Sequence, residues 1–216
     1  MGRCENSGLE DIRIGPEYVR NMGQSSKGTQ LKFRKENMWY KQNQNGYEGK
    51  AEYLCSLLLS YTNIKEWVVY QECRINGRNG CMPHNFLQDG EECVSLQRLY
   101  EYHYGGQLYE KIRKFDAVEE RIFFILNFVK KITKLDITNY LSQLLVLDMV
   151  TLNIDRHFHN ICLIRNAKGA YRTAPVFDNG AALFSNYGIF PVENTLEENI
   201  RRAAAAPFSG SFEQQY

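Results

Sequence analysis

The chain has 216 residues, of which 44% are hydrophobic and 13% aromatic, and its formal net charge is +1 at pH 7. This length suits one large domain or two small lobes, and the near-neutral charge argues against an extensive nucleic-acid interface. No apolar run is long enough to span a membrane, and the N-terminal residues lack the apolar core of a signal peptide. We therefore expect a soluble, cytoplasmic protein that does not bind membranes or nucleic acid directly. A secreted effector is the alternative for its location.

The first elements that the pattern predicts are the two strands of a β-hairpin. Residues from Leu31 to Arg34 and from Met38 to Lys41 alternate in character, and turn-forming residues separate them. The stretch from Ser25 to Thr29, just before the hairpin, is small and polar. The backbone N–H groups of such a loop, at Gly28 and Thr29, can face a phosphate, although an ordinary connecting loop is an equal alternative.

A helix is expected next, over residues 46–62. Apolar side chains recur there at helical spacing, namely Tyr47, Ala51, Leu54, Leu58 and Leu59. Glu48 and Glu52 lie four residues apart and therefore share one face. One of them could meet Lys41, at the end of the hairpin, and hold that lysine on the α- and β-phosphates of a nucleotide. The alternative is that these groups are solvated surface charges.

The pattern changes from strands to helices near residue 100. Strands are expected over 66–75 and 92–99, a loop-rich stretch over 77–89, and helices over 108–114, 117–133, 137–152 and 197–206. We therefore predict an α+β fold with a β-rich N-terminal lobe over 1–100, containing one helix, and a helical C-terminal lobe over 101–216. The helix over 137–152 is apolar on most of its surface and is expected to be buried. A charge inside it, Asp148, suggests an anchor for the loop that follows, because an unpaired buried carboxylate is costly.

The most informative stretch is NIDRHFHN, residues 153–160, followed by FDNG at residues 177–180. Phosphoryl transfer typically uses an acid that orients a hydroxyl, together with an Asn and an Asp that bind a hard cation. Mg²⁺ prefers oxygen ligands and usually takes only one or two carboxylates. We therefore interpret Asp155 as the base, or hydroxyl-orienting group, and Asn160 and Asp178 as the metal ligands. The alternative is an Asp-rich turn that joins a helix to a hairpin.

The six cysteines form no CxxC motif, and free buried thiols are their expected state. A zinc site built from Cys81, His84 and Cys93 is one alternative. A metal site at His157 and His159 is another, and it would suit a metal-dependent nuclease, the least favoured function.

Several segments, taken in order, resemble the HipA-like protein kinases, including their short bacterial effector-type members. These segments are GTQLKF (28–33), MWYK (38–41), YEGKAEYL (47–54), VSLQRLY (94–100), LNIDRHFHN (152–160) and APVFDNG (174–180). Each segment alone matches the family only weakly, whereas the whole set in this order is specific and spans about residues 25–185. The resemblance implies a bilobal protein-kinase-like fold with ATP between the lobes. Kinases of this kind usually continue with more helices after the metal-binding Asp, so we expect a reduced C-terminal lobe, with the substrate platform reduced, supplied by a partner or missing here.

The resemblance also implies roles for individual residues. Lys41 corresponds to the phosphate-binding lysine and Glu52 to its partner on the helix, with Glu48 as second choice. Gln97 to Leu99 correspond to the hinge, where backbone groups meet adenine. Arg156 and His157 follow the base and stabilise its loop.

A serine in the phosphate loop of HipA-like kinases can be autophosphorylated, which ejects the loop and switches the enzyme off. Ser25 falls nearest that position, with Ser26 adjacent. Asn179 stands where kinases usually have Phe, so switching by a Phe beside the metal-binding Asp is not expected.

We therefore predict an ATP- and Mg²⁺-dependent kinase that acts on Ser or Thr of a protein, including itself. A pseudokinase-type module that binds nucleotide or partners without phosphoryl transfer is the first alternative. A small-molecule kinase is the second.

Overall fold

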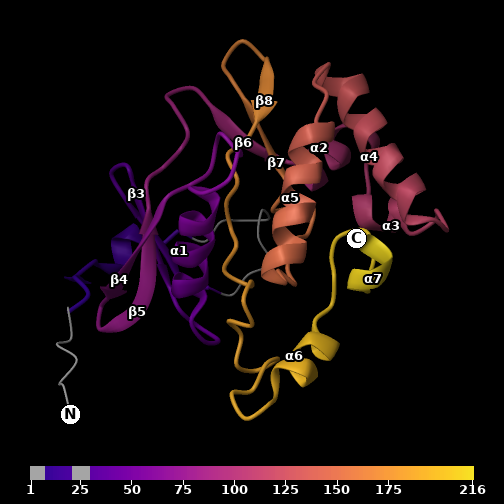
Figure 1. Cartoon of the computed structure of the whole chain (residues 1–216). Helices are drawn as coiled ribbons and strands as arrows, with labels where there is room; N and C mark the ends of the chain where they lie inside the picture. Colours follow the sequence, from indigo (N-terminus) through magenta and orange to yellow (C-terminus); the bar gives the residue numbers. More distant parts are fainter. Residues whose placement is uncertain (1–7, 21–29) are drawn as a thin grey trace.

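The computed structural model describes residues 8–20 and 30–216. Within these residues the N-terminal half forms a five-stranded sheet in the order β1-β4-β5-β3-β2. Its strands are β1 (Asp11–Ile12), β2 (Lys32–Lys35), β3 (Met38–Gln42), β4 (Tyr70–Ile75) and β5 (Arg78–Pro83), and a short 3-10 helix, η1 (Pro16–Tyr18), precedes β2. Helix α1 (Glu48–Leu59) packs on β4 and β5, on the side of the sheet that faces the C-terminal half (Figure 1).

The predicted hairpin is confirmed by the pairing of β2 with β3. Its register places Lys32 directly opposite Lys41 and Phe33 directly opposite Tyr40. Directly opposed residues point to the same face of a sheet. Phe33 and Tyr40 therefore pack together on one face, in a small core around Ile75. The two lysines point to the other face, toward α1 and the C-terminal half.

Strand β5 lies in the stretch that we expected to be loop-rich, so that prediction is wrong. The sequence RNGCMP has little strand propensity of its own, but β3 and β4 pair with it on both sides. Gly80 is needed in this strand, because a Cβ would collide with the carbonyl oxygen of Lys41. A Cβ on Gly49 of α1 would in turn collide with the backbone of Gly80. The two glycines thus let helix and sheet approach closely behind Lys41.

Helix α1 confirms the expected helix but buries only part of the predicted apolar stripe, namely Ala51 and Leu59. Leu54 and Leu58, from the predicted apolar stripe, are 40% and 39% exposed. The buried face consists of Gly49, Ala51, Glu52, Cys55, Ser56 and Leu59. This face is partly polar because it lies against a site that contains charged groups.

The C-terminal half is mainly helical and contains the largest hydrophobic core. Helices α3 (Leu108–Ile112), α4 (Val118–Thr133) and α5 (Thr138–Thr151) confirm three of the four helices expected there. The fourth, expected over 197–206, is α6 (Leu196–Arg202), which ends at Arg202 rather than at residue 206, and α7 (Phe212–Gln215) follows. A three-stranded sheet of β6 (Glu92–Ser95), β7 (Cys162–Arg165) and β8 (Tyr171–Thr173) lies between these helices and the N-terminal sheet (Figure 1). Near the C-terminus, Phe208 packs its ring against Phe158.

The strand predicted over 92–99 ends at Ser95, and an unexpected helix, α2 (Leu96–Tyr104), begins there. The hydroxyl of Ser95 accepts a hydrogen bond from the backbone N–H of Arg98 at 3.2 Å, which caps the helix. Leu96, Leu99 and Tyr100 of this helix are buried in the core. The second half of the strand prediction is therefore wrong.

Helix α5 is buried on one side only, which corrects the expectation that it is buried nearly all round. Leu144 and Leu147 face the core, whereas Val146 and Val150 are 56% and 61% exposed.

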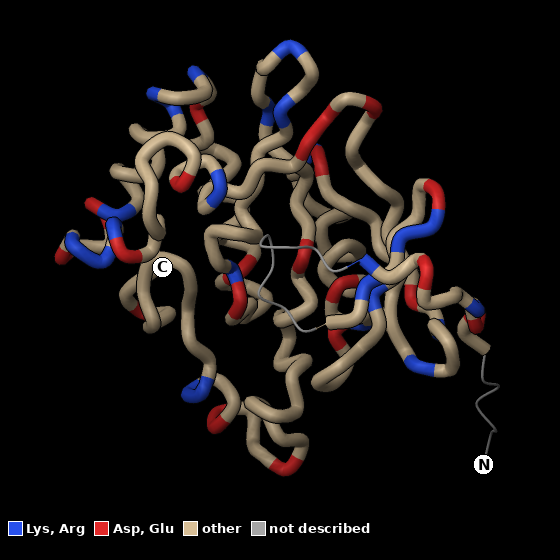
Figure 2. Tube along the Cα trace, turned by 180° about the vertical axis from the view of Figure 1, so that it is seen from behind, with Lys and Arg blue, Asp and Glu red and all other residues tan. Residues whose placement is uncertain are grey.

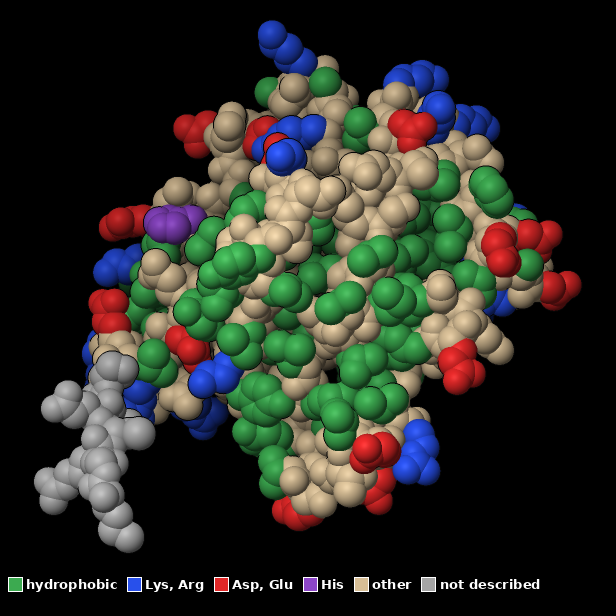
Figure 3. All heavy atoms as spheres, viewed as in Figure 1, with side chains coloured by type: hydrophobic (Ala, Val, Ile, Leu, Met, Phe, Trp, Pro, Cys, Tyr) green, Lys and Arg blue, Asp and Glu red, His purple; other side chains and the backbone are tan. Residues whose placement is uncertain are grey.

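Hydrophobic side chains occupy much of the face on which α1 and α5 lie (Figure 3). Acidic and basic residues are interspersed over both halves of the molecule (Figure 2). Among residues 8–20 and 30–216, no helix combines the length and the apolar character needed to cross a membrane.

Candidate active site

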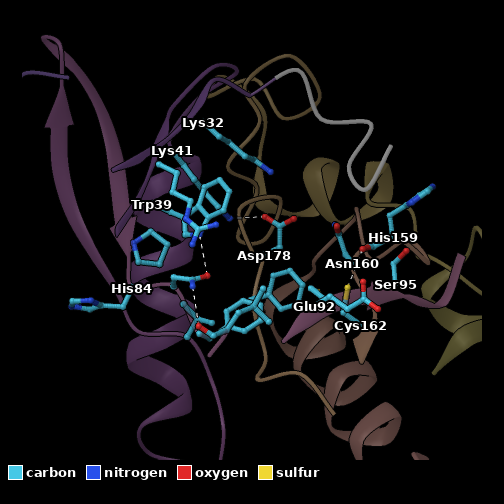
Figure 4. A pocket seen from close by; sticks show the side chains of 18 of the residues that line it. Lys32, Trp39, Lys41, His84, Glu92, Ser95, His159, Asn160, Cys162 and Asp178 are labelled. Carbon is cyan, nitrogen blue, oxygen red and sulfur yellow. Dashed lines mark hydrogen bonds and ion pairs between the residues drawn. The ribbon is translucent and has the colours of Figure 1, made fainter. Parts of the chain in front are cut away.

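The side chain of Lys41 lies between two carboxylates from distant parts of the chain. Its Nζ atom is 2.7 Å from Glu52 Oε1. It is also 2.7 Å from Asp178 Oδ1 (Figure 4). Burial disfavours the charge of Lys41, but Asp178 and Glu52 outweigh this effect and raise its pKa well above the usual value. Lys41 therefore stays protonated and connects β3, α1 and the segment around Asp178.

This cluster carries one positive and two negative charges when all three groups are ionised. Burial disfavours the charge of Asp178, but Lys41 and Lys32 lower its pKa below the ordinary range. For Glu52 burial dominates and raises the pKa, although Lys41 opposes it. Lys32 offsets part of the negative charge, because it lies close enough to lower the pKa of Asp178. Asp178 therefore stays ionised and can act as a ligand for a cation.

Tyr70 and Asn179 hold this cluster in place, and sequence analysis assigned a role to neither. The Tyr70 hydroxyl accepts hydrogen bonds from Lys41 Nζ at 3.4 Å and from the backbone N–H of Asp178 at 3.2 Å. The backbone N–H of Asn179 donates to Glu52 Oε2 at 2.7 Å. Asp178 itself has a positive φ of 60°, a conformation that Asp tolerates better than most residues. These contacts fix the carboxylate of Asp178 against Lys41.

The loop with Asp155 is anchored by a buried ion pair, as the position of Asp148 suggested. Arg156 and Asp148 are both 0% exposed. Arg156 Nε donates to Asp148 Oδ2 at 2.9 Å, and Nη2 donates to Oδ1 at 3.0 Å. Arg156 also donates to the carbonyl oxygen of Phe177 at 2.9 Å and to Asn179 Oδ1 at 2.6 Å. One guanidinium therefore holds together α5, the loop over 153–160 and the segment with Asp178.

Asp155 and Asn160 lie on this anchored loop. The side chain of Asp155 is 61% exposed, and His157 Nε2 is 3.8 Å from its carboxylate. The Asn160 amide nitrogen donates to the backbone oxygen of Asp155 at 3.2 Å, which leaves the amide oxygen available to a cation. Asn160 and Asp178 line the same pockets. Two oxygen donors, only one of them a carboxylate, are a set that fits Mg²⁺.

Two pockets meet at these residues. One of about 470 Å³ includes Lys41, and one of about 360 Å³ includes Asp155. Lys32, Asn160 and Asp178 line both of them. Sequence analysis missed Lys32, which the hairpin register places beside Lys41. A polyphosphate that extends from one pocket toward Asp155 would pass these three side chains.

The larger pocket is also lined by the two ends of the connection from β5 to β6 and by β6 itself. These lining residues are Pro83 to Leu87, Glu91, Glu92, Cys93 and Ser95. Of Gln97 to Leu99, expected at a hinge that meets adenine, Arg98 lines this pocket, whereas Gln97 and Leu99 do not. The Gln97 side chain accepts a hydrogen bond from the Leu108 backbone at 3.1 Å, and Leu99 is in the core. These two side chains point away from the pocket because the chain becomes helical at Leu96.

Several other predicted features lie outside the described residues or lack support. Gly28, Thr29, Ser25 and Ser26 fall outside the ranges 8–20 and 30–216. Within those ranges, no three or more His, Cys, Asp or Glu side chains come together to hold a metal ion. The zinc alternative at Cys81, His84 and Cys93 is therefore wrong. His157 and His159 stack edge to face, with ring centroids 5.5 Å apart, without a third such ligand.

No protein-family model and no curated protein matches the sequence. Among solved structures, the chain is similar to the crystal structure of a proinflammatory kinase, CtkA, from Helicobacter pylori, with a TM-score of 0.56 and 15% sequence identity. The match covers 72% of this chain and 56% of that one. The chain thus spans little more than half the length of that kinase. The predicted fold is confirmed: the protein has a mixed α/β, bilobal kinase-like fold.

Proposed function

We propose that this protein is an ATP- and Mg²⁺-dependent kinase of the HipA-like type that phosphorylates Ser or Thr of a protein, including itself. The observation that supports this most strongly is the position of Lys41 between Glu52 and Asp178, beside an anchored loop that carries Asp155 and Asn160. The kinase-like fold supports phosphoryl transfer at a coarser level.

In this proposal the phosphates of ATP lie where the two pockets meet. Lys41, oriented by Glu52, binds the α- and β-phosphates, and Lys32 adds a second positive charge on the same face of the hairpin. Asn160 and Asp178 would hold Mg²⁺, which when bound neutralises charge on the phosphate oxygens. The apolar remainder of the larger pocket, which includes Phe86 and Phe177, receives the adenine ring of ATP.

Asp155 acts on the acceptor. Its exposed carboxylate orients the substrate hydroxyl and accepts its proton as the new O–P bond forms and the bond to the β-phosphate oxygen breaks. Catalysis of this kind depends mainly on positioning and on fixed charges. The ion pair between Arg156 and Asp148 therefore contributes by fixing the position of Asp155 relative to the segment with Asp178.

The test is purified protein incubated with γ-labelled ATP and Mg²⁺, beside Asp155→Asn, Asp178→Asn and the control Asp116→Asn. Asp116 lies on the surface outside the pockets, so its variant controls for the loss of one carboxylate. Intact mass should show added phosphate in wild type and control. Asp155→Asn should transfer about 10²–10⁴-fold more slowly while keeping the thermal stabilisation by nucleotide, and Asp178→Asn should lose both.

Full transfer by Asp155→Asn would contradict the assignment of the base. Nucleotide-dependent stabilisation without transfer, to itself or to a panel of proteins, would favour a pseudokinase-type module. Transfer to small molecules alone would favour a small-molecule kinase, and the absence of both transfer and stabilisation would remove the ATP proposal.

A further inference from the structure

After Asp178 the chain runs back along the N-terminal half of the molecule. Residues 183–187, which we call the strap, lie against residues 45–47 in the connection from β3 to α1. Gly46 and Asn186 form an antiparallel β-bridge there. Figure 1 shows this part of the chain, in orange, running between α1 and α5. The strap therefore joins the two halves through contacts between segments that are far apart in the sequence.

Backbone and side-chain hydrogen bonds hold the strap in this position. The backbone N–H of Tyr47 donates to the carbonyl oxygen of Ser185 at 3.1 Å. The backbone N–H of Tyr187 donates to the carbonyl oxygen of Asn45 at 2.9 Å. The Tyr47 hydroxyl donates to the carbonyl oxygen of Leu183 at 2.8 Å, and the ring centroids of Tyr47 and Tyr187 are 5.3 Å apart. Both halves of the contact thus depend on Tyr47.

The contact is close, and the backbone of the strap is strained. A Cβ on Gly46 would overlap the carbonyl oxygen of Ser185, so this approach requires glycine. Leu183 and Phe184 each have a φ of 55°, a left-handed conformation that is unfavourable for bulky side chains and persists only where surrounding contacts impose it. Detachment of the strap would let both residues relax, so the strain favours opening.

The strap is connected on both sides to the residues around Lys41. On one side it continues the segment that begins at Asp178. On the other side its partner Tyr47 directly precedes α1, the helix that carries Glu52. Asp178 and Glu52 both contact Lys41, so the closed strap helps to hold the two carboxylates at this lysine. An open strap would let α1 and the segment with Asp178 move apart.

We propose that the strap opens and closes as a unit and that nucleotide binds the closed state. This regulation rests on the proposed function, because a nucleotide held by both Lys41 and Asp178 needs the arrangement that the closed strap maintains. A ligand shifts a conformational equilibrium by the difference between its affinities for the two states. The coupling is reciprocal: nucleotide keeps the strap closed, and a change that opens the strap weakens nucleotide binding.

Native-state hydrogen exchange on the ¹⁵N-labelled full chain, followed by NMR, measures local opening. In wild type, the amides of Tyr47 and Tyr187 should show the same free energy of opening, because one event exposes both. Tyr47→Phe removes the hydrogen bond to Leu183 and should raise the exchange rates of both amides about 5-fold. The control Tyr61→Phe, which removes a hydroxyl from a side chain that is 83% exposed, should leave both rates unchanged.

Nucleotide binding tests the coupling. At about 100 times its Kd, a non-hydrolysable ATP analogue with Mg²⁺ should slow exchange at Tyr47 and Tyr187 up to about 100-fold in wild type. Gly46→Ala should hold the strap open and weaken binding of the analogue at least about 10-fold in a calorimetric titration. The matched control is Gly210→Ala, whose Cβ would meet no atom within 4 Å, and its affinity should equal that of wild type.

Unequal opening at Tyr47 and Tyr187, or unchanged exchange in Tyr47→Phe, would overturn the proposal that the strap moves as a unit. An opening free energy equal to that of global unfolding would overturn it too, because the strap would then not open on its own. Bound analogue that leaves the exchange rates unchanged, or wild-type affinity in Gly46→Ala, would overturn the coupling. If wild type binds no nucleotide, the proposed function fails, while exchange without nucleotide still decides whether the strap opens as a unit.

Discussion

Replacement of Asp148 by Asn should strongly destabilise the protein, because it separates a buried ion pair. Asp148 and Arg156 are both 0% exposed, and two nitrogen–oxygen contacts of 2.9 and 3.0 Å join them. The variant keeps the shape of the side chain but removes its negative charge. Arg156 then stays buried with neutral acceptors only, the carbonyl oxygen of Phe177 and the amide oxygen of Asn179.

Removal of one partner of a buried pair typically costs about 3–5 kcal/mol. For a chain of this size, about 2–4 °C is lost per kcal/mol, so the melting temperature should fall by about 6–20 °C. Urea denaturation followed by circular dichroism measures the free energy of unfolding directly. The matched control is Glu92→Gln, which breaks an exposed pair with Arg165 of nearly the same length, 3.0 Å. That control should lose less than about 1 kcal/mol.

A loss below about 1 kcal/mol for Asp148→Asn would refute this reasoning, because it would mean that the charge of Arg156 is compensated without Asp148. A second comparison avoids dependence on one variant. Asp148→Leu combined with Arg156→Met should be more stable than Asp148→Leu alone, since the double variant leaves no uncompensated charge in the interior. Equal or lower stability of the double variant would contradict the ion-pair account.

Three further outcomes are expected. Lys32→Met should weaken nucleotide binding about 10- to 100-fold in a thermal-shift or calorimetric titration, because a hydrogen bond to a charged group contributes about 1.5–3 kcal/mol. The control Lys35→Met, at the exposed end of the same hairpin, should leave nucleotide binding unchanged. Equal effects of the two variants would contradict the role of Lys32. Ser95→Ala should lower the free energy of unfolding by about 1 kcal/mol through loss of the cap of α2, and no change in urea denaturation would count against that cap. Hydrogen bonds from Thr138 lower the pKa of Asp136 to about 2, so the stability from this carboxylate should be present above pH 3.8 and be lost as the pH falls through about 2; an NMR titration with a midpoint at the ordinary value would contradict this.

The sequence by itself determined the elements whose side-chain pattern repeats over a few residues. The hairpin of β2 and β3 and the helices α3, α4 and α5 follow from strand and helix periodicity. This periodicity can be recognised within each segment, without knowing which other segments pack against it. The spacing from Asp155 to Asn160 and on to Asp178 likewise indicated which side chains could act together. Their roles stay predictions until phosphoryl transfer is measured.

Only the tertiary structure decided the features that depend on partners distant in the sequence. Strand β5 exists because β3 and β4 pair with it on both sides, although its own residues favour a loop. Glu52 is buried because Lys41 and the backbone of Asn179 meet its carboxylate, so the face that α1 buries could not be predicted from hydrophobicity. A buried charge or a weak strand is stable only where other segments supply its partners, and the fold alone brings those segments together.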